Sequence, residues 1–107
     1  MSNRLEQIQA MLADDPSDTF LRYSLAMEQA KAGDHAESLE GLAGLTRETP
    51  PYVPAFFMAA QQLVDLDRVN EARGFLREGI EVARQQNNNH AAAEMSEYLA
   101  MLGEHGE

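Results

Sequence analysis

The sequence predicts an all-α protein of about six short helices joined by tight turns. Apolar residues recur at helical spacing in one segment after another of the 107 residues. No alternating run of β-branched residues, which would indicate a strand, occurs along the chain. Two stretches 34 residues apart, AGDHAESLEGL at 32–42 and LDRVNEARGFL at 66–76, share the order of a turn residue, a glutamate and a leucine. We therefore expect a helix–turn–helix unit that is repeated twice within a single domain.

The first two helices are predicted from their apolar stripes and from the residues that end them. The first stripe falls at i, i+3, i+6 and i+7, and Pro16 stops that helix. It consists of Leu5, Ile8, Met11 and Leu12. The second helix ends at Gly33, which readily takes the left-handed conformation of a helix C-cap. Its apolar residues are Phe20, Leu21, Leu25, Met27 and Ala30.

The third and fourth helices are predicted mainly from their starts. Asp34 with Glu37 three residues later has the pattern of a capping box, which predicts the start of the third helix. This helix carries Leu39, Leu42 and Leu45 and ends at TPPYVP. Pro54 suits the first turn of the fourth helix, where its missing N–H costs nothing. The apolar face of the fourth helix consists of Phe56, Phe57, Ala60, Leu63 and Val64.

The fifth helix follows a turn at 65–67, and the sixth follows three asparagines, Asn87 to Asn89, that can cap it. The fifth helix carries Val69, Ala72, Phe75, Leu76, Ile80 and Ala83. The sixth carries Ala92, Met95, Leu99 and Leu102. We expect the sixth helix to end near residue 103 and GEHGE at 103–107 to be a frayed tail.

The 34-residue offset extends beyond the two opening stretches. The matching pairs are Pro16 with Pro50, Ala26 with Ala60, Gly33 with Asp67, Glu37 with Glu71, Ser38 with Ala72 and Leu42 with Leu76. A helix–turn–helix with this period resembles the tetratricopeptide repeat. An unrelated bundle whose alanines and leucines coincide by chance is the alternative, and the ordered run of turn, small, large and proline positions argues against it. The resemblance implies one domain over 1–107, a short right-handed α-solenoid with a half-repeat helix at 4–15, repeats at 17–50 and 51–86, and a capping helix at 89–103.

The motif of this family can be followed residue by residue. In the first unit it falls on Leu25, Ala26, Gly33, Ser38, Leu42 and Pro50, and in the second on Phe56, Ala60, Ala72, Leu76 and Gly79. Arg22 stands where an aromatic residue is usual, and Leu45 replaces the small residue that Gly79 supplies. Arg84 replaces the terminal proline, so the fifth helix is expected to run on to about residue 86. Three glycines inside helices, at 41, 44 and 74, each cost about 1 kcal/mol relative to alanine.

The resemblance also implies a binding face, because the first helix of each such unit lines a concave surface where family members usually bind peptides. The concave positions carried over are Phe20, Tyr23, Met27, Ala30 and Lys31, then Pro54, Phe57, Met58, Gln61, Val64 and Asp65. Of these, the candidate site residues are Phe20, Tyr23, Met27, Lys31, Phe57, Met58, Gln61 and Val64. One branch of the family grips acidic C-terminal tails with Lys and Asn, but Tyr23, Met27 and Met58 stand at those positions, which argues against that ligand. An apolar or amphipathic peptide or helix fits better.

Two other uses of this face remain open. The first or the sixth helix could cover it, in which case its methionines and phenylalanines belong to the core. Alternatively, two copies of the chain could cover each other as a homodimer with no separate peptide ligand.

Composition limits the possible partners. Eighteen acidic residues against eight basic ones give a net charge of −10, and Lys31 is the one lysine. Such a surface repels phosphate, so we expect an apolar or basic protein segment as partner and neither nucleic acid nor membrane. Cysteine is absent, and neither a membrane-spanning run nor a secretory signal is recognisable, so a cytoplasmic location is expected.

No pattern of catalytic or metal-ligating residues stands out. His35, His90 and His105 are far apart and lack metal-binding spacing. The paired carboxylates at 14–15 and 65–67 are ordinary turn chemistry, and no phosphate-binding or nucleophile motif occurs. We expect a non-catalytic protein-interaction module without cofactor or metal, with a self-associating structural protein as the alternative.

Overall fold

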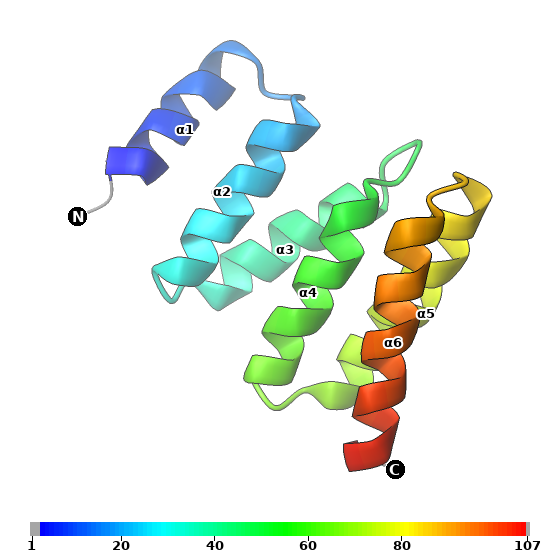
Figure 1. Cartoon of the computed structure of the whole chain (residues 1–107). Helices are drawn as coiled ribbons and strands as arrows, with labels where there is room; N and C mark the ends of the chain where they lie inside the picture. Colours follow the sequence, from blue (N-terminus) through cyan, green and yellow to red (C-terminus); the bar gives the residue numbers. More distant parts are fainter. Residues whose placement is uncertain (1–2, 107) are drawn as a thin grey trace.

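The computed structural model describes residues 3–106, and in that range it contains six helices and no strand (Figure 1). The helices are α1 (Asn3–Asp14), α2 (Thr19–Lys31), α3 (His35–Thr46), α4 (Val53–Asp65), α5 (Val69–Gln85) and α6 (Asn89–Gly106). Each helix packs mainly on the next one along the chain, and α6 also touches α4. Such nearest-neighbour packing is the hallmark of a repeat stack. The all-α prediction is confirmed.

The helices form two layers. In Figure 1, α2, α4 and α6 lie on the side facing the viewer, and α3 and α5 lie behind them. α1 packs on α2 at the N-terminal end of the stack. The two helices expected to line a concave face, α2 and α4, thus share one layer with α6.

Three helices end in the same way. Gly33, Asp67 and Asn87 adopt positive φ angles of 87°, 62° and 60° after α2, α4 and α5. The next residue's N–H then bonds back to the carbonyl five residues earlier, in each case over 2.8 Å. This is the 6→1 bond of a Schellman motif, which satisfies carbonyls at the helix end. The predicted equivalence of Gly33 and Asp67 is thus confirmed.

The helix starts are capped unevenly. Asp18 Oδ1 accepts the Leu21 N–H over 2.9 Å, and Asn88 Oδ1 accepts the Ala91 N–H over 3.2 Å. The capping box predicted at Asp34 is wrong, because the Asp34 side chain makes no capping hydrogen bond. The Asp34 N–H, which a capping glutamate would have to satisfy, already bonds to the Gln29 carbonyl.

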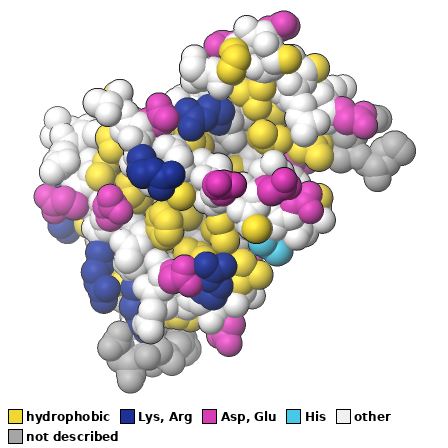
Figure 2. Space-filling model, turned by 180° about the vertical axis from the view of Figure 1, so that it is seen from behind, with side chains coloured by type: hydrophobic (Ala, Val, Ile, Leu, Met, Phe, Trp, Pro, Cys, Tyr) yellow, Lys and Arg dark blue, Asp and Glu magenta, His cyan; other side chains and the backbone are white. Residues whose placement is uncertain are grey.

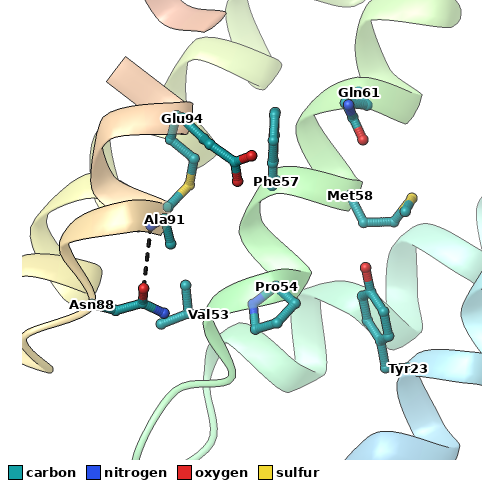
Figure 3. Close-up of a pocket in the computed structure, with 10 residues that line it drawn as sticks. Tyr23, Val53, Pro54, Phe57, Met58, Gln61, Asn88, Ala91 and Glu94 are labelled. Atoms are coloured by element: carbon teal, nitrogen blue, oxygen red, sulfur yellow. Dashed lines mark hydrogen bonds between the residues drawn. The ribbon is translucent and has the colours of Figure 1, made fainter. Parts of the chain in front are cut away.

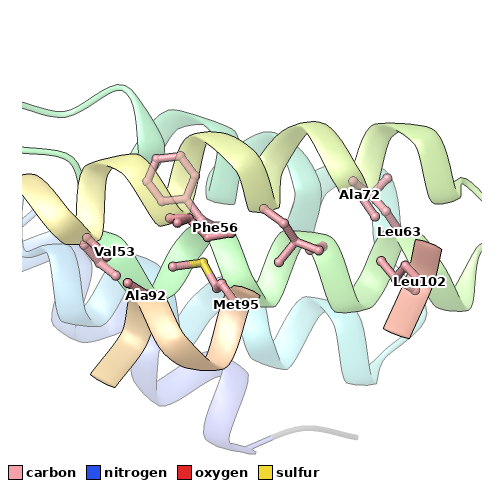
Figure 4. Packing of buried hydrophobic residues seen from close by; sticks show 11 residues of the cluster. Val53, Phe56, Leu63, Ala72, Ala92, Met95 and Leu102 are labelled. Carbon is pink, nitrogen blue, oxygen red and sulfur yellow. The ribbon is translucent and has the colours of Figure 1, made fainter. Parts of the chain in front are cut away.

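The core consists of two adjoining clusters. The larger joins α4, α5 and α6 (Figure 4), and its biggest fully buried members are Phe56, Leu63, Leu76 and Met95. The smaller joins α2, α3 and α4 and consists of Ala26, Leu42, Leu45, Ala55 and Ala59. In α1, Ile8 is buried, but Met11 is 46% exposed, so the apolar stripe predicted there is wrong at Met11.

A buried chain of hydrogen bonds ties α2, α3 and α4 together. Ser38 Oγ donates to the Ala26 carbonyl over 2.6 Å and accepts from Gln62 Nε2 over 3.0 Å. The other end of the amide, Gln62 Oε1, lies 2.7 Å from His35 Nδ1, which donates to it. Ser38 Oγ and both ends of the Gln62 amide have partners, so burying these two side chains leaves none of their polar atoms unpaired.

The predicted end of α5 agrees with the structure, whereas α6 continues further than expected. α5 ends at Gln85, close to the expected residue 86. The frayed tail predicted at 103–107 is wrong for 103–106, which continue α6, and Glu107 lies outside the described residues. Leu102 is 8% exposed, and its carbonyl accepts from Arg73 Nη2 over 3.1 Å. These contacts anchor the last turns of α6 on α5.

Candidate binding groove

An apolar groove follows α4 between α2 and α6. Its first hollow, of about 170 Å³, lies against the first half of α4 and includes Tyr23, Pro54, Phe57, Ala91 and Glu94 (Figure 3). A second, of about 440 Å³, adjoins it toward the C-terminal end of α4 and shares Met58 and Gln61 with the first. A smaller one lies between Phe57 and α6. We call this surface the α4 groove, formed by Tyr23, Lys31, Pro54, Phe57, Met58, Gln61, Asp65, Ala91, Glu94, Glu97 and Tyr98.

Five of the eight candidate residues meet in this groove. Tyr23, Phe57, Met58 and Gln61 line the first hollow, and Lys31 lines the second. The other three line neither hollow. Phe20 is 63% exposed on α2, Met27 is half-buried, and Val64 packs against the α4–α6 core.

Aromatic pairs fix the walls of the groove. Phe57 on α4 and Tyr98 on α6 meet edge to face, with ring centroids 5.4 Å apart. Tyr23 packs on Tyr52 at 5.5 Å. Such pairs contribute about 1 kcal/mol beyond the area they bury, and they hold the rings in place before any ligand arrives.

Two of these tyrosines are held as neutral phenols. Burial, and secondarily the nearby Asp65 carboxylate, raises the pKa of Tyr98. Burial, and secondarily Tyr52, raises the pKa of Tyr23. Both hydroxyls therefore stay protonated at neutral pH and can donate a hydrogen bond to a ligand.

α6 forms one wall of the groove and is not a cover over it. It packs chiefly on α5 and meets α4 along one edge. Ala91, Glu94 and Tyr98 face the groove from α6. α1 packs on α2 at the end of the stack. The possibility that one of these helices closes the face is therefore not realised within residues 3–106.

The groove residues of α6 were missed by sequence reasoning, although a signal was present. Applying the 34-residue offset once more carries Phe57 to Ala91 and Val64 to Tyr98. Both Ala91 and Tyr98 line the groove. α6 thus occupies the place of the first helix of a third unit.

The groove carries carboxylates that no nearby cation neutralises. Within the described residues, no basic side chain pairs with Asp65 or Glu97. Glu94 lies 3.5 Å from His90, an exposed side chain. Lys31, which also lines the second hollow, has its Nζ 3.3 Å from Glu28. The groove is therefore apolar at its floor and negative along its α6 side and its far end.

The back of the molecule differs in charge. Figure 2 shows Lys and Arg side chains there, interspersed with carboxylates and apolar patches. A trough of about 450 Å³ between α3 and α5, lined by Leu39 and Phe75, is flanked by an ion pair. Arg68 donates to both carboxylate oxygens of Glu71 over 2.8 Å, which raises the pKa of Arg68 and lowers that of Glu71. Glu40 also lines the trough, so one carboxylate remains beside this neutralised pair.

The described residues bring no three His, Asp or Glu side chains together in a metal-holding arrangement. His35 bonds to Gln62, and His90 lies exposed at the start of α6. The side chain of His105 lies outside the described part of the chain. No helix within 3–106 is long and apolar enough to cross a membrane.

Comparison with known proteins identifies the fold. No family model and no curated protein matches the chain. The solution NMR structure of a tetratricopeptide repeat domain protein from Salinibacter ruber matches with a TM-score of 0.76 and 29% identity. The match covers 81% of this chain and 88% of that one. The chain thus has an all-α tetratricopeptide-like repeat fold, which confirms the resemblance seen in the sequence and suggests a protein-interaction module in general.

Proposed function

We propose that this protein is a non-catalytic interaction module that binds an amphipathic segment of another protein in the α4 groove. The observation that carries the proposal is the apolar hollow lined by Tyr23, Phe57 and Met58 on the face formed by α2, α4 and α6. The aromatic rings supply large contact areas that are already held in place, which lowers the entropy cost of binding. Met58 is flexible and polarizable and can adapt to the ligand's side chains.

A helical ligand suits this groove better than an extended one. The walls are helices, whose backbone N–H and C=O groups are mostly bonded internally, so no sheet edge is available to pair with a strand. A helix satisfies its own backbone hydrogen bonds and needs only to bury an apolar stripe. Gln61 and Asn88 at the groove can then accept or donate a few orienting hydrogen bonds.

The test is an affinity pull-down from native cell extract with folded variants of the chain. Tyr23→Glu and Phe57→Glu place a charge in the groove, and Gln61→Arg fills it from an exposed position with no risk to the core. Ala36→Glu is the matched control, since it adds the same charge to the exposed edge of the back trough. Circular dichroism establishes that each variant is folded.

We expect the wild-type and Ala36→Glu proteins to retain the same partner and the groove variants to lose it. If folded Gln61→Arg and Phe57→Glu proteins retain every partner, the proposal is wrong. Sedimentation at micromolar concentration should give a monomer, because two copies of charge −10 repel each other. If the protein instead forms a dimer that the Phe57→Glu change abolishes, the groove serves self-association and not the binding of a separate partner.

A further inference from the structure

The charge around the α4 groove indicates what kind of segment fits it. Glu94 and Glu97 lie beside the Phe57–Tyr98 pair on the α6 side, and Asp65 lies beside Tyr98 at the far end. In Figure 3 the Glu94 carboxylate extends from α6 toward Phe57. Three carboxylates thus border an aromatic surface from two different helices.

These carboxylates are available to a partner. Within the described residues, Asp65 and Glu97 have no cationic side chain within salt-bridge distance, and Glu94 faces only His90. Three glutamates outside the groove are paired within the chain itself. Glu28 meets Arg4 and Lys31, Glu48 meets Arg22, and Glu71 meets Arg68.

An aromatic surface bordered by carboxylates favours cations over anions. A Lys or Arg head near such a surface gains ion pairing together with attraction to the negative faces of the rings. An acidic segment would meet repulsion from all three carboxylates. A second copy of this chain is disfavoured for the same reason, because its own groove is negative.

We infer that the occupant of the α4 groove is a basic amphipathic helix. Its apolar stripe packs on Phe57 and Met58, and its Lys or Arg residues face Asp65, Glu94 and Glu97. This inference rests on the proposed function and adds the charge and the form of the ligand. α4 has 13 residues, so a bound helix that runs its length has about 13 residues and a length of about 20 Å.

The inference can be tested with three fluorescein-labelled helical peptides of about 14 residues, about 21 Å long as helices. All three carry leucine in one helical stripe on an alanine background. The first has lysine at the flanking positions, the second glutamine and the third glutamate. Fluorescence anisotropy measures the affinity of each peptide for the full chain at about 50 and about 300 mM salt, which spans strong and weak screening.

We expect the lysine peptide to bind about tenfold more tightly than the glutamine peptide at low salt and the glutamate peptide to bind weakest. The Asp65→Asn/Glu97→Gln double variant should weaken the lysine peptide about fivefold and leave the glutamine peptide unchanged. The control is Glu78→Gln/Glu81→Gln, which removes two exposed carboxylates of α5 that do not line the groove. This control should leave the affinity for the lysine peptide unchanged.

Each other outcome overturns the inference. Equal loss in the groove and control variants would mean that only the net charge attracts the peptide. If the glutamine and lysine peptides bind equally tightly and Phe57→Glu abolishes the binding of both, the groove is the binding site but has no preference for a basic ligand. Failure of the lysine peptide to bind would end the inference, while the pull-down with groove variants would still decide the proposed function.

Discussion

The two helix–turn–helix units, α2–α3 and α4–α5, differ in which helix supplies the large side chain that fills the space between their helices. The second unit uses its first helix, and the first unit uses its second helix. In the second unit the large residue is Phe56 on α4, and Gly79 on α5 makes room for it. In the first unit the equivalent positions hold Arg22 on α2 and Leu45 on α3. Leu45 is fully buried, whereas Arg22 turns outward to Glu48 over 3.2 Å. The repeat therefore maintains the filled volume between its helices, and the identities of the residues that fill it differ.

The largest effect expected from this comparison is at Leu45. Leu45→Ala should lower the free energy of unfolding by about 3 kcal/mol, because it removes a fully buried side chain and leaves a cavity. The same change made in an Arg22→Phe background should cost less, since a phenylalanine at 22 can fill the space as Phe56 does in the second unit. Urea unfolding of the four proteins of this cycle measures both values.

If the changes in unfolding free energy caused by Leu45→Ala and Arg22→Phe are additive, a side chain at position 22 does not fill the space that Leu45 occupies. Arg22→Ala serves as the control, because it removes the same exposed ion pair without adding volume. It should leave the cost of Leu45→Ala unchanged.

The second effect separates two glycines of α5. A Cβ at Gly79 would lie 2.6 Å from Phe56 Cβ and 2.7 Å from Met95 Sδ, whereas one at Gly74 would meet nothing within 4 Å. Gly79→Ala should therefore destabilise the protein by about 2 kcal/mol through overpacking. Gly74→Ala should stabilise it by about 1 kcal/mol through its better helix propensity. Thermal unfolding followed at 222 nm checks both signs, and a loss of stability in both variants would contradict the account.

The third effect concerns Ser38, whose counterpart in the second unit is the buried Ala72. Ser38→Ala should cost about 1.5 kcal/mol, because it leaves the Gln62 amide without its partner in a buried site. Adding Gln62→Leu should recover part of this loss by removing the unpaired amide. If the double variant is less stable than Ser38→Ala alone, the hydrogen-bond chain is not the reason for the serine.

Much of the fold could be predicted because turns and small residues are local signals. Gly33 and Asp67 mark the left-handed ends of equivalent helices, and their φ angles of 87° and 62° agree with that assignment. The capping box at Asp34 could not be excluded from sequence, since the competing bond to Gln29 comes from the preceding turn. The extent of α6 depends on contacts with α5, a helix that begins about 20 residues upstream, which no local pattern reports.

The site could be predicted where the register of the repeat determines the direction in which a side chain points. Tyr23, Phe57 and Gln61 meet in one hollow because equivalent positions on successive first helices point the same way. Phe20 lies in the first turn of α2, is 63% exposed and lines neither hollow of the groove. Tyr98 was missed because no second helix follows α6 within the described residues, so the motif positions that reveal a repeat are incomplete in that range.

We propose that ligands bind in the α4 groove and not on the back trough. A ¹H–¹⁵N correlation spectrum of the labelled chain, recorded while the lysine peptide is added, tests it most directly. We predict saturable shifts concentrated at Tyr23, Phe57, Gln61 and Tyr98 that disappear in Gln61→Arg. Shifts concentrated at Leu39 and Phe75 between α3 and α5 would contradict the claim.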